Sequence, residues 1–434
     1  METSDAVGPT WKGRFFAIWG GQAFSLVGSS VAGFALVWWL TKTTGSATVL
    51  AGATLATVLP QILLGPLAGA VVDRWSRRLI MIVADGGIAM VSLWLAYLFW
   101  SGAMRPWHVY AIMLARAVGG AFHWPAMQSS TSLMVPKRHL SRVAGVNQAL
   151  QGGAGILSPP IGALLISILP LYAVMLIDVG TAAFAVLPLA LVRIPQPRRS
   201  SAGAEGAAAS SFLGDVKAGW HYVIGWPGLM LIVAAAVLLN FAVMPGLALI
   251  PILVTRHFGG QALQLAWLDS AMSLGFVVGG LALGVWGGFR RRILTAMMGV
   301  VGMGLGLLLV AAAPRSAFWL GLAGMSLAGV MNPMANGPIQ AVIQATVDAD
   351  MQGRVLTLLG SLCAMATPVS LLVAGPIADV LGIRFWYLVG GIITLLVGML
   401  GFFLPTLYHF EEGRPRTTVT VPSEPQAHSN VEAP

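Results

Sequence analysis

Residues 48–100 read TVLAGATLATVLPQILLGPLAGAVVDRWSRRLIMIVADGGIAMVSLWLAYLFW, which is two long apolar stretches separated by the charged segment Asp73–Arg78. Each stretch is long enough for a helix that crosses a bilayer, which needs about 20 apolar residues. The same pattern recurs along the chain and predicts an all-α membrane protein with twelve transmembrane helices. The expected spans lie near residues 15–40, 48–72, 79–100, 107–129, 143–167, 171–192, 228–254, 265–287, 293–313, 317–346, 355–380 and 385–406.

The composition of the 434 residues agrees with this prediction. Hydrophobic residues make up 57% and charged residues 9%, whereas a soluble domain has about 25% charged residues. Such a chain cannot cover itself with a water-facing surface, which excludes a soluble enzyme, a secreted disulfide scaffold and a disordered protein. The single cysteine, Cys363, allows neither an internal disulfide nor a cysteine metal cluster.

The positive charges predict the orientation of the chain. If the N-terminus is cytoplasmic, eighteen of the 24 Lys and Arg residues lie on the inner side, five lie in outer loops and Arg116 lies within span four. Inner loops are enriched in Lys and Arg, so both termini are expected in the cytoplasm. The first span, about 26 residues long, exceeds the apolar region of a cleaved signal peptide. We expect a multi-pass protein of a bacterial-type inner membrane.

The longest hydrophilic interruption divides the spans into two sets of six. It begins with a Ser/Ala/Gly-rich connector and continues as FLGDVKAGWHYVIGWPG, which predicts an interfacial helix with Phe212, Trp220 and Tyr222 at the lipid boundary. Two similar halves are typical of transporters whose substrate path lies where the halves meet. The expected parts are a cytoplasmic N-terminus (1–13), a six-helix bundle (14–192), a linker (193–227), a second bundle (228–406) and a cytoplasmic tail (407–434).

The charged loop after span two contains Gly69, Asp73, Arg74, Arg77 and Arg78. This spacing resembles the signature loop of the major facilitator superfamily, in which the loop acts as a gating latch. The glycine would let two helices approach closely, a helix N-terminus or an arginine would neutralise the aspartate, and the arginines would face anionic lipid. The alternative is ordinary positive charge on the inner side of the membrane.

Span five contains the run Ala154–Ala163, with Pro159 and Gly162 as the expected gating residues. The run resembles the glycine-proline motif of antiporters in the same superfamily, although Ala154, Ser158 and Ala163 replace glycines. Small residues permit close helix crossing, and prolines bend a helix and free backbone carbonyls. A kinked packing helix without any directional role is the alternative.

Four further segments extend the resemblance along nearly the whole chain. They are similar to the drug and siderophore exporter branch of the superfamily, and most similar to macrolide-efflux proteins. The resemblance implies a transporter rather than an enzyme, with spans one, four, seven and ten lining a central cavity. The segments are Phe122–Ala126, Val135–Pro136 with Val143–Gln148, Gly353–Val355 and Gly375–Asp379.

A charge within a span is costly and therefore points to function, and three aspartates and one arginine of the expected spans are singled out on this ground. A carboxylate in a partly dry cavity can exchange a proton and an arginine can hold an anion, so Asp85, Arg116, Asp178 and Asp269 are the candidates for proton coupling. Each has a structural alternative. Asp85 and Asp178 could pair helices, Asp269 could cap the start of span eight, and Arg116 could form a salt bridge.

Polar side chains on the expected cavity helices form the candidate substrate site. The amides on span ten recur every four residues and so share one helix face. Apolar walls with few hydrogen-bonding groups suit a bulky amphiphile. In the alternative, the amides join helices and His123 bonds a backbone carbonyl. The candidate residues are Gln22, Arg116, His123, Trp124, Asn240, Asn332, Asn336 and Gln340.

The sequence therefore predicts a secondary exporter of amphiphilic drugs such as macrolides, driven by proton antiport and working by alternating access. No phosphate-binding loop or metalloprotease or hydrolase motif occurs, so we expect no cofactor, no metal and no nucleic-acid partner. Protons and anionic lipids are the other expected partners of a monomer. The alternatives are export of a siderophore or lipid-like metabolite, and a non-transporting membrane scaffold or sensor.

Overall fold

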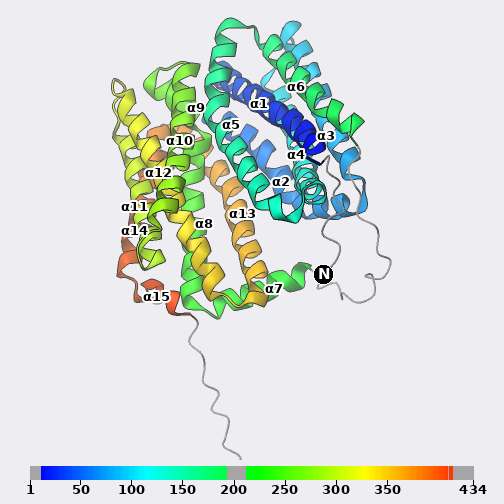
Figure 1. Cartoon of the computed structure of the whole chain (residues 1–434). Coiled ribbons are helices and arrows are strands. Elements are labelled where there is room, and N and C mark those ends of the chain that lie inside the picture. The colour runs from blue at the N-terminus through cyan, green and yellow to red at the C-terminus, as the bar shows by residue number, and fades with distance from the viewer. Residues whose placement is uncertain (1–10, 193–211, 409, 414–434) are drawn as a thin grey trace, which may run out of the picture.

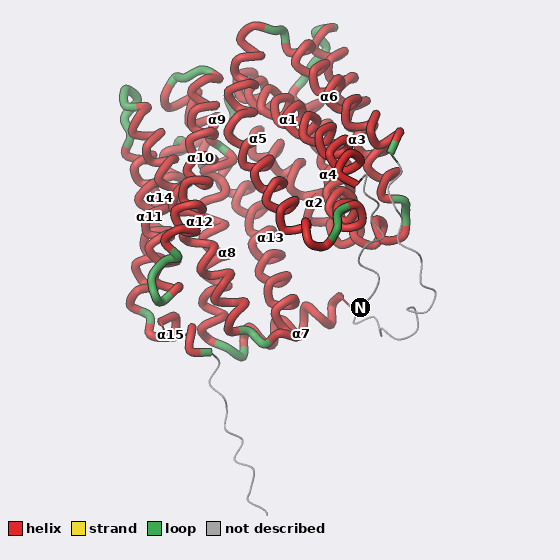
Figure 2. Tube along the Cα trace, viewed as in Figure 1, coloured by secondary structure: helices red, strands yellow, loops and turns green. Residues whose placement is uncertain are grey.

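The computed structural model describes residues 11–192, 212–408 and 410–413. Within these ranges the protein is helical and has no strand (Figures 1 and 2). Its long helices are α1 (Trp11–Thr44), α2 (Ala47–Arg74), α3 (Arg77–Trp100), α4 (Pro106–Met134), α5 (Leu140–Ile168), α6 (Leu171–Leu191), α8 (Pro227–Ala248), α10 (Ala262–Trp286), α11 (Arg292–Ala312), α12 (Phe318–Thr346), α13 (Ala349–Leu381) and α14 (Ile383–Phe403). The twelve-helix, all-α membrane fold is confirmed.

Short helical segments connect or end the long ones. The helix α7 runs across one edge of the molecule (Figure 1). The segment η2 has π-helical hydrogen bonding. The short segments are η1 (Lys137–His139), α7 (Phe212–Ile224), α9 (Ile250–Ile252), η2 (Leu253–Phe258), α15 (Pro405–Tyr408) and η3 (Phe410–Glu412).

Ten helices of the described chain are long and apolar enough to cross a membrane. The two long helices outside this group are α4 and α12. The first carries Arg116, His123 and the polar run Gln128–Thr131, and the second carries Asn332 and Asn336. Polar residues at membrane depth face a bundle interior or a cavity. We therefore expect these two helices to line a polar cavity or path in the bundle.

The long helices pack in two groups, α1–α6 and α8–α14, called the N-half and the C-half below (Figure 1). The main contacts between the halves join α2 to α13 and α5 to α10. One end of the bundle carries the turns after α1, α3, α5, α11 and α13, and the sequence predicts that it faces outward. It is called the outer end.

The two ends of the bundle are packed differently. Toward the outer end, a single apolar cluster combines Leu40, Leu50 and Val109 of the N-half with Leu265 and Leu371 of the C-half. Toward the opposite end, the two halves have separate clusters, one around Phe15 and Met81 and the other around Ile293, Ile343 and Val355. The apolar cluster that joins the halves thus lies toward the outer end.

Some helix boundaries differ from the sequence expectation. The helix α13 begins at Ala349, six residues before the expected span. Residues 349–354 include Asp350, Gln352 and Arg354. A hydropathy window detects the part of a helix that lies in lipid rather than its whole length. The helix α1 begins at Trp11, inside the expected N-terminal tail.

The segment expected to form an interfacial helix is helical in α7, where Tyr222 contacts the protein as well. Its hydroxyl donates to the Asp348 carboxylate at 3.0 Å, at the start of α13. Gly219 also faces the backbone of α13 at Arg354, and Trp220 is exposed. The helix packs on the C-half because one of its faces is apolar. Residues 193–211 and the Phe212 side chain lie outside the described residues.

Candidate functional site

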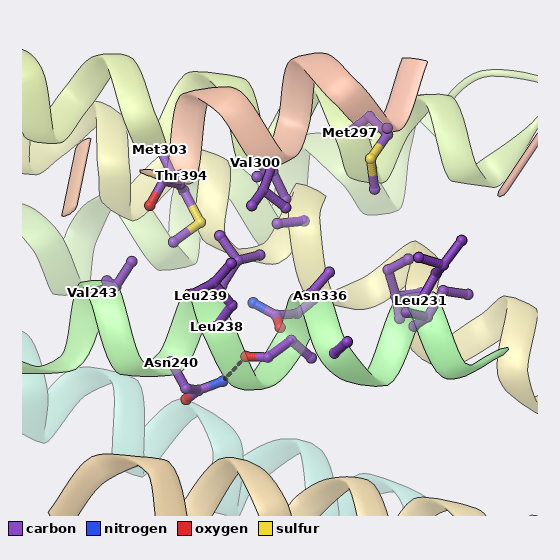
Figure 3. A pocket seen from close by; sticks show the side chains of 18 of the residues that line it. Leu231, Leu238, Leu239, Asn240, Val243, Met297, Val300, Met303, Asn336 and Thr394 are labelled. Carbon is purple, nitrogen blue, oxygen red and sulfur yellow. Dashed lines mark hydrogen bonds between the residues drawn. The ribbon is translucent and has the colours of Figure 1, made fainter. Parts of the chain in front are cut away.

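A cavity of about 350 Å³ lies within the C-half, between α8, α11, α12 and α14. Figure 3 shows Leu231, Leu238 and Leu239 of α8 on one side and Met297, Val300, Met303 and Thr394 on the other, with Asn336 between them. Most of the lining is aliphatic or methionine, which adapts to irregular apolar shapes. The cavity has the size and character of a small-molecule site.

Three amides supply polar groups to this C-half cavity. Asn336 Nδ2 lies 3.0 Å from Asn332 O and 3.2 Å from Asn332 Oδ1, which confirms that the two amides share a helix face. Asn240 Nδ2 donates to Ala236 O at 2.9 Å (Figure 3). Among the described residues, neither Asn240 Oδ1 nor Asn336 Oδ1 has a hydrogen-bond partner. Both oxygens can therefore accept from a ligand.

A second, more polar cavity of about 150 Å³ lies within the N-half, between α1, α3, α4 and α5. Gln22 Nε2 donates to Asp85 Oδ2 at 2.8 Å. His123 Nε2 lies 3.2 Å from Asp85 Oδ1, within ion-pair distance but without hydrogen-bond geometry. The indoles of Trp19 and the exposed Trp124 complete the wall. Asp85 is thus incompletely bonded and lines a cavity.

The expected substrate residues divide between these two cavities. Gln22, His123 and Trp124 line the N-half cavity, and Asn240, Asn332 and Asn336 line the C-half cavity. Arg116 and Gln340 line neither. The reason is that α12 turns Gln340 to an exposed position one turn beyond Asn336, while Arg116 is engaged elsewhere.

Arg116 forms a buried ion pair with Asp178. Its Nη1 lies 2.6 Å from Asp178 Oδ2 and 2.7 Å from Ser92 Oγ. Ser92 and Ser29 also donate to the two Asp178 oxygens, at 2.6 and 2.9 Å. The Asp178 side chain has no exposed surface. This cluster joins α1, α3, α4 and α6. The geometry therefore agrees with the structural alternatives, which were a salt bridge for Arg116 and helix pairing for Asp178.

Asp269 lies in the eighth position of α10, and the hypothesis that it caps this helix is wrong. Gln261 is the N-cap residue, and its backbone N–H is accepted by Gln264 Oε1 at 2.8 Å. Asp269 instead lines a cavity of about 380 Å³ between α1, α5 and α10. Two turns of helix separate it from the α10 N-terminus, too far for a cap.

Asp379, at the outer end of α13, binds the N-terminus of α2. The carboxylate accepts from Ala47 N at 2.8 Å, Thr48 N at 2.9 Å and Ser46 Oγ at 2.8 Å. Arg256 Nη1 adds an ion pair at 2.9 Å. A helix N-terminus favours a carboxylate because its first N–H groups lack partners. This set of contacts, the outer clamp, connects the two halves.

Gly375 makes this approach possible. A Cβ atom at Gly375 would lie 3.0 Å from Thr48 Cα, so a larger residue would push α13 away from α2. Gly375 and Asp379 have the same spacing as Gly69 and Asp73. The pair in α13 lies at its outer end, whereas the pair in α2 lies at the opposite end.

His257 lies beside the outer clamp, at the end of η2. Its Nε2 atom is 2.9 Å from the Ala313 carbonyl oxygen. Burial lowers the pKa of His257; the Ala313 carbonyl opposes this, and the charges of Arg384 and Arg315 lower the pKa further. The ring is therefore neutral in the folded protein at neutral pH.

Two arginines of the loop after α2 bind helix carbonyls, whereas the sequence predicted that they face anionic lipid. Arg77 is buried and donates to Ser129 O at 2.8 Å, and Arg78 donates to the carbonyls of Leu189 and Ala190 at the end of α6. These two arginines neutralise helix carbonyls instead of facing lipid. Arg74 is exposed.

The predicted close approach at Gly69 is absent in this conformation. No described atom lies within 4 Å of where a Cβ would be. The ends of the halves are separate here, so α2 has no partner helix to approach at this point. The Asp73 side chain lies outside the described residues.

The glycine-proline motif of α5 contacts helices of both halves. A Cβ at Gly162 would lie 2.8 Å from Phe34 of α1, which shows the close packing that the motif predicts. Pro160 removes the N–H that would bind the Ile156 carbonyl. Ser270 of α10 donates to that carbonyl at 2.7 Å. The expectation that prolines free carbonyls is thus met, with a partner from the opposite half. Pro159 lines the Asp269 cavity.

Sequence reasoning did not assign a role to Asp379 or to the serines around Asp178. Asp379 ends a span, so hydropathy classed it as a boundary residue. The sequence feature that could have identified Asp379 is the glycine-to-aspartate spacing that Gly69–Asp73 and Gly375–Asp379 share. Ser29 and Ser92 have no sequence signal, because serine is common in apolar helices that pack closely.

Comparison with known proteins agrees with this architecture. A family model described as "Transmembrane secretion effector" matches residues 4–430. Macrolide efflux protein A of Streptococcus pyogenes is 32% identical over 389 residues, which are 90% of this chain and 95% of that protein. The multidrug efflux pump Tap of Mycolicibacterium fortuitum is 27% identical over 395 residues, which are 88% and 93% of the two chains.

A solved structure shows the same fold. It is the crystal structure of a bacterial homologue of the human lysosomal transporter Spinster, in an inward-facing and unoccupied conformation. The TM-score is 0.68 at 13% identity, with 94% of this chain and 99% of that chain covered. Since the family model spans almost the whole chain, this protein belongs to the transmembrane secretion effector family of major facilitator transporters.

Proposed function

We propose that this protein exports amphiphilic drugs, macrolides among them, from the cytoplasm in exchange for protons. The observation that carries the proposal is the C-half cavity, whose walls are apolar except for Asn240, Asn332, Asn336 and Thr394. A large apolar surface with a few hydrogen-bonding groups suits a bulky amphiphile. The 32% identity to macrolide efflux protein A supports the same substrate class.

The charges around the cavities favour neutral or cationic cargo. Asp85 and Asp269 contribute carboxylates to the three cavities described above, and His123 is the one residue that lines them and can carry positive charge. Arg116 is neutralised by Asp178. These carboxylates would repel an anionic siderophore, and no guanidinium lines the three cavities to attract it. The siderophore alternative is therefore less favoured.

The difference between the two ends of the bundle supports alternating access. We infer that this conformation is open to the cytoplasm, with the outer clamp and the shared apolar cluster closing the outer end. The Asp73 loop would close the opposite end in the other conformation, as Asp379 closes this one. Rocking of the N-half against the C-half would then expose the cavities to each side in turn.

Proton coupling needs a carboxylate that can gain and lose a proton. Asp178 is held by Arg116 and two serines, whereas Asp85 and Asp269 are incompletely bonded. The coupling role proposed for Asp85, Arg116, Asp178 and Asp269 from the sequence therefore narrows to Asp85 and Asp269. The exporter would act in a bacterial inner membrane as a monomer, with both termini in the cytoplasm.

The test uses purified protein in liposomes with a pH-sensitive dye inside. Macrolides, lipophilic cations and siderophores are added one at a time under an imposed proton gradient. The Asn332→Ala/Asn336→Ala variant loses two hydrogen bonds of about 1 kcal/mol each. We expect roughly 30-fold weaker apparent affinity for amphiphiles. Leu396→Ala, on the exposed face of α14, is the matched control. Absence of flux for every amphiphile would support the scaffold alternative instead.

A further inference from the structure

The contact between α5 and α10, called the seam, joins the halves through small residues. Besides the bond from Ser270 to Ile156, a Cβ at Gly155 would lie 3.1 Å from Ser273 Oγ, and one at Gly152 would lie 3.4 Å from Val277. The two helices therefore touch closely along one face. A change of charge at this contact would directly affect whether the halves stay together.

Asp269 borders the seam, one residue before Ser270. Its cavity is lined by Phe34 of α1, by Ser158 and Pro159 of α5, and by Leu265 of α10. Within the described residues, Asp269 makes neither an ion pair nor a hydrogen bond. Its neighbours Leu265 and Leu268 belong to the apolar cluster that joins the halves. A carboxyl group here lies between the two halves without a counter-charge.

Ser158 provides a second, independent observation in the same cavity. Its side chain is 2% exposed, and its Oγ atom has no hydrogen-bond partner in the described chain. A buried hydroxyl without a partner is uncommon in native proteins and calls for an explanation. Asp269 and Ser158, from opposite halves, thus line one cavity with unused hydrogen-bonding capacity.

An ionised carboxylate is costly in such surroundings unless a cation neutralises it. Ca²⁺ and Mg²⁺ take about six to eight oxygen ligands. The described cavity offers one carboxylate and a small number of other polar side chains, Ser30, Gln151 and Ser158. A proton needs only the carboxylate oxygen itself. Proton binding is therefore the chemistry that this site fits.

We propose that Asp269 carries the coupling proton, with Ser158 as its hydrogen-bonding partner across the seam. A proton from the outer side binds the Asp269 carboxylate to give the neutral acid, and α5 then packs against α10. When the acid releases that proton toward the cytoplasmic cavity, the ionised carboxylate weakens the closed seam. The proposal rests on the proton-antiport function above and assigns its coupling site.

The other intramembrane aspartates fit this role less well. Asp178 is saturated by Arg116, Ser29 and Ser92. Asp85 lies wholly within the N-half, so its protonation changes no contact between the halves. Of these three carboxylates, Asp269 is the one at the interface between the halves.

The variant Asp269→Asn tests the proposal in proteoliposomes that contain a labelled amphiphile. A gradient of one pH unit supports about tenfold accumulation for one proton per cargo molecule. We expect wild type and the surface control Asp350→Asn to accumulate cargo. Asp269→Asn should bring cargo only to equal concentrations on the two sides. Gradient-driven accumulation by Asp269→Asn at the wild-type level would overturn the proposal, and so would accumulation driven by Na⁺ at equal pH.

A spectroscopic measurement tests the proton site independently of transport. Infrared difference spectra between acidic and alkaline pH should show a protonated carboxyl band that is lost in Asp269→Asn and shifted in Ser158→Ala. A band unchanged in both variants would refute the assignment of Asp269. If wild type moves no cargo while the band behaves as expected, the proton site stands and the export function fails.

Discussion

Asp178 and Asp269 are both aspartates within membrane-spanning helices, yet their surroundings are opposite. Asp178 has no exposed surface and accepts bonds from Arg116, Ser29 and Ser92. Asp269 has no such partner in the described chain and lies at the seam between the halves. The first carboxylate holds four helices of one half together. The second is the carboxylate that we propose as the coupling site.

This difference shows that a buried charge alone does not indicate a working site. The charge of a carboxylate in an ion pair is compensated within the fold. A carboxylate without partners has no such compensation. Asp85 lies between these two cases. It accepts one hydrogen bond from Gln22, and its contact with His123 lacks hydrogen-bond geometry.

The largest expected effect concerns the saturated carboxylate. Asp178→Leu leaves Arg116 buried without its partner, which should destabilise the protein by about 3–5 kcal/mol. Thermal unfolding in detergent measures this loss. The double variant Arg116→Met/Asp178→Leu removes both charges and should recover most of the stability. Equal stability of wild type and Asp178→Leu would show that the ion pair has no structural role.

The next effect concerns the outer clamp, which is only partly buried. Asp379→Ala removes the carboxylate from the α2 N-terminus, where loss of a capping side chain costs about 0.5–2 kcal/mol. We expect the population to shift up to about 30-fold toward the outward-open state. Distances between spin labels on α2 and α13 report the shift, in a Cys363→Ser background.

Arg256→Gln is the matched control for the outer clamp. It removes an exposed ion pair worth at most about 1 kcal/mol and leaves the helix cap in place. Its shift should be the smaller of the two. A larger shift in Arg256→Gln than in Asp379→Ala would mean that the ion pair, and not the cap, closes the outer end.

A change at Asp85, the partly bonded carboxylate, should weaken the binding of cationic ligands more than that of neutral ones. Asp85→Asn keeps the size of the side chain and removes its charge from the N-half cavity. Hydrogen bonds to charged groups contribute about 1.5–3 kcal/mol, so binding of a cationic amphiphile should weaken roughly tenfold or more. Binding of a neutral amphiphile of similar shape should change little. Equal losses for both ligands would indicate a packing defect.

The smallest expected effect is the pH dependence at His257. Because the folded protein lowers the pKa of this ring, the unfolded chain binds more protons as the pH falls below about 6.5. The contribution of His257 to stability is thus present above that pH and is lost as the pH falls. Unfolding curves at pH 7.5 and 5.5 should differ less in His257→Gln than in wild type. An unchanged difference would assign the pH dependence to other groups.

The fold was largely predictable because lipid imposes a simple rule on sequence. Each span must be long and apolar, so the hydropathy pattern located twelve helices to within a few residues. The amides of α12 were also predictable, since four-residue spacing places Asn332 and Asn336 on one face of any helix.

The sequence alone determined the number of helices, the division into halves, the family and the residues that carry charge into the membrane. Only the tertiary structure decided which of them meet. Asp178 and Arg116 are 62 residues apart, and Asp379 and Ala47 are 332 residues apart. Periodicity assigns a residue to a helix face, but partners across helices depend on how the bundle packs laterally. That packing separated the saturated Asp178 from the unpaired Asp269.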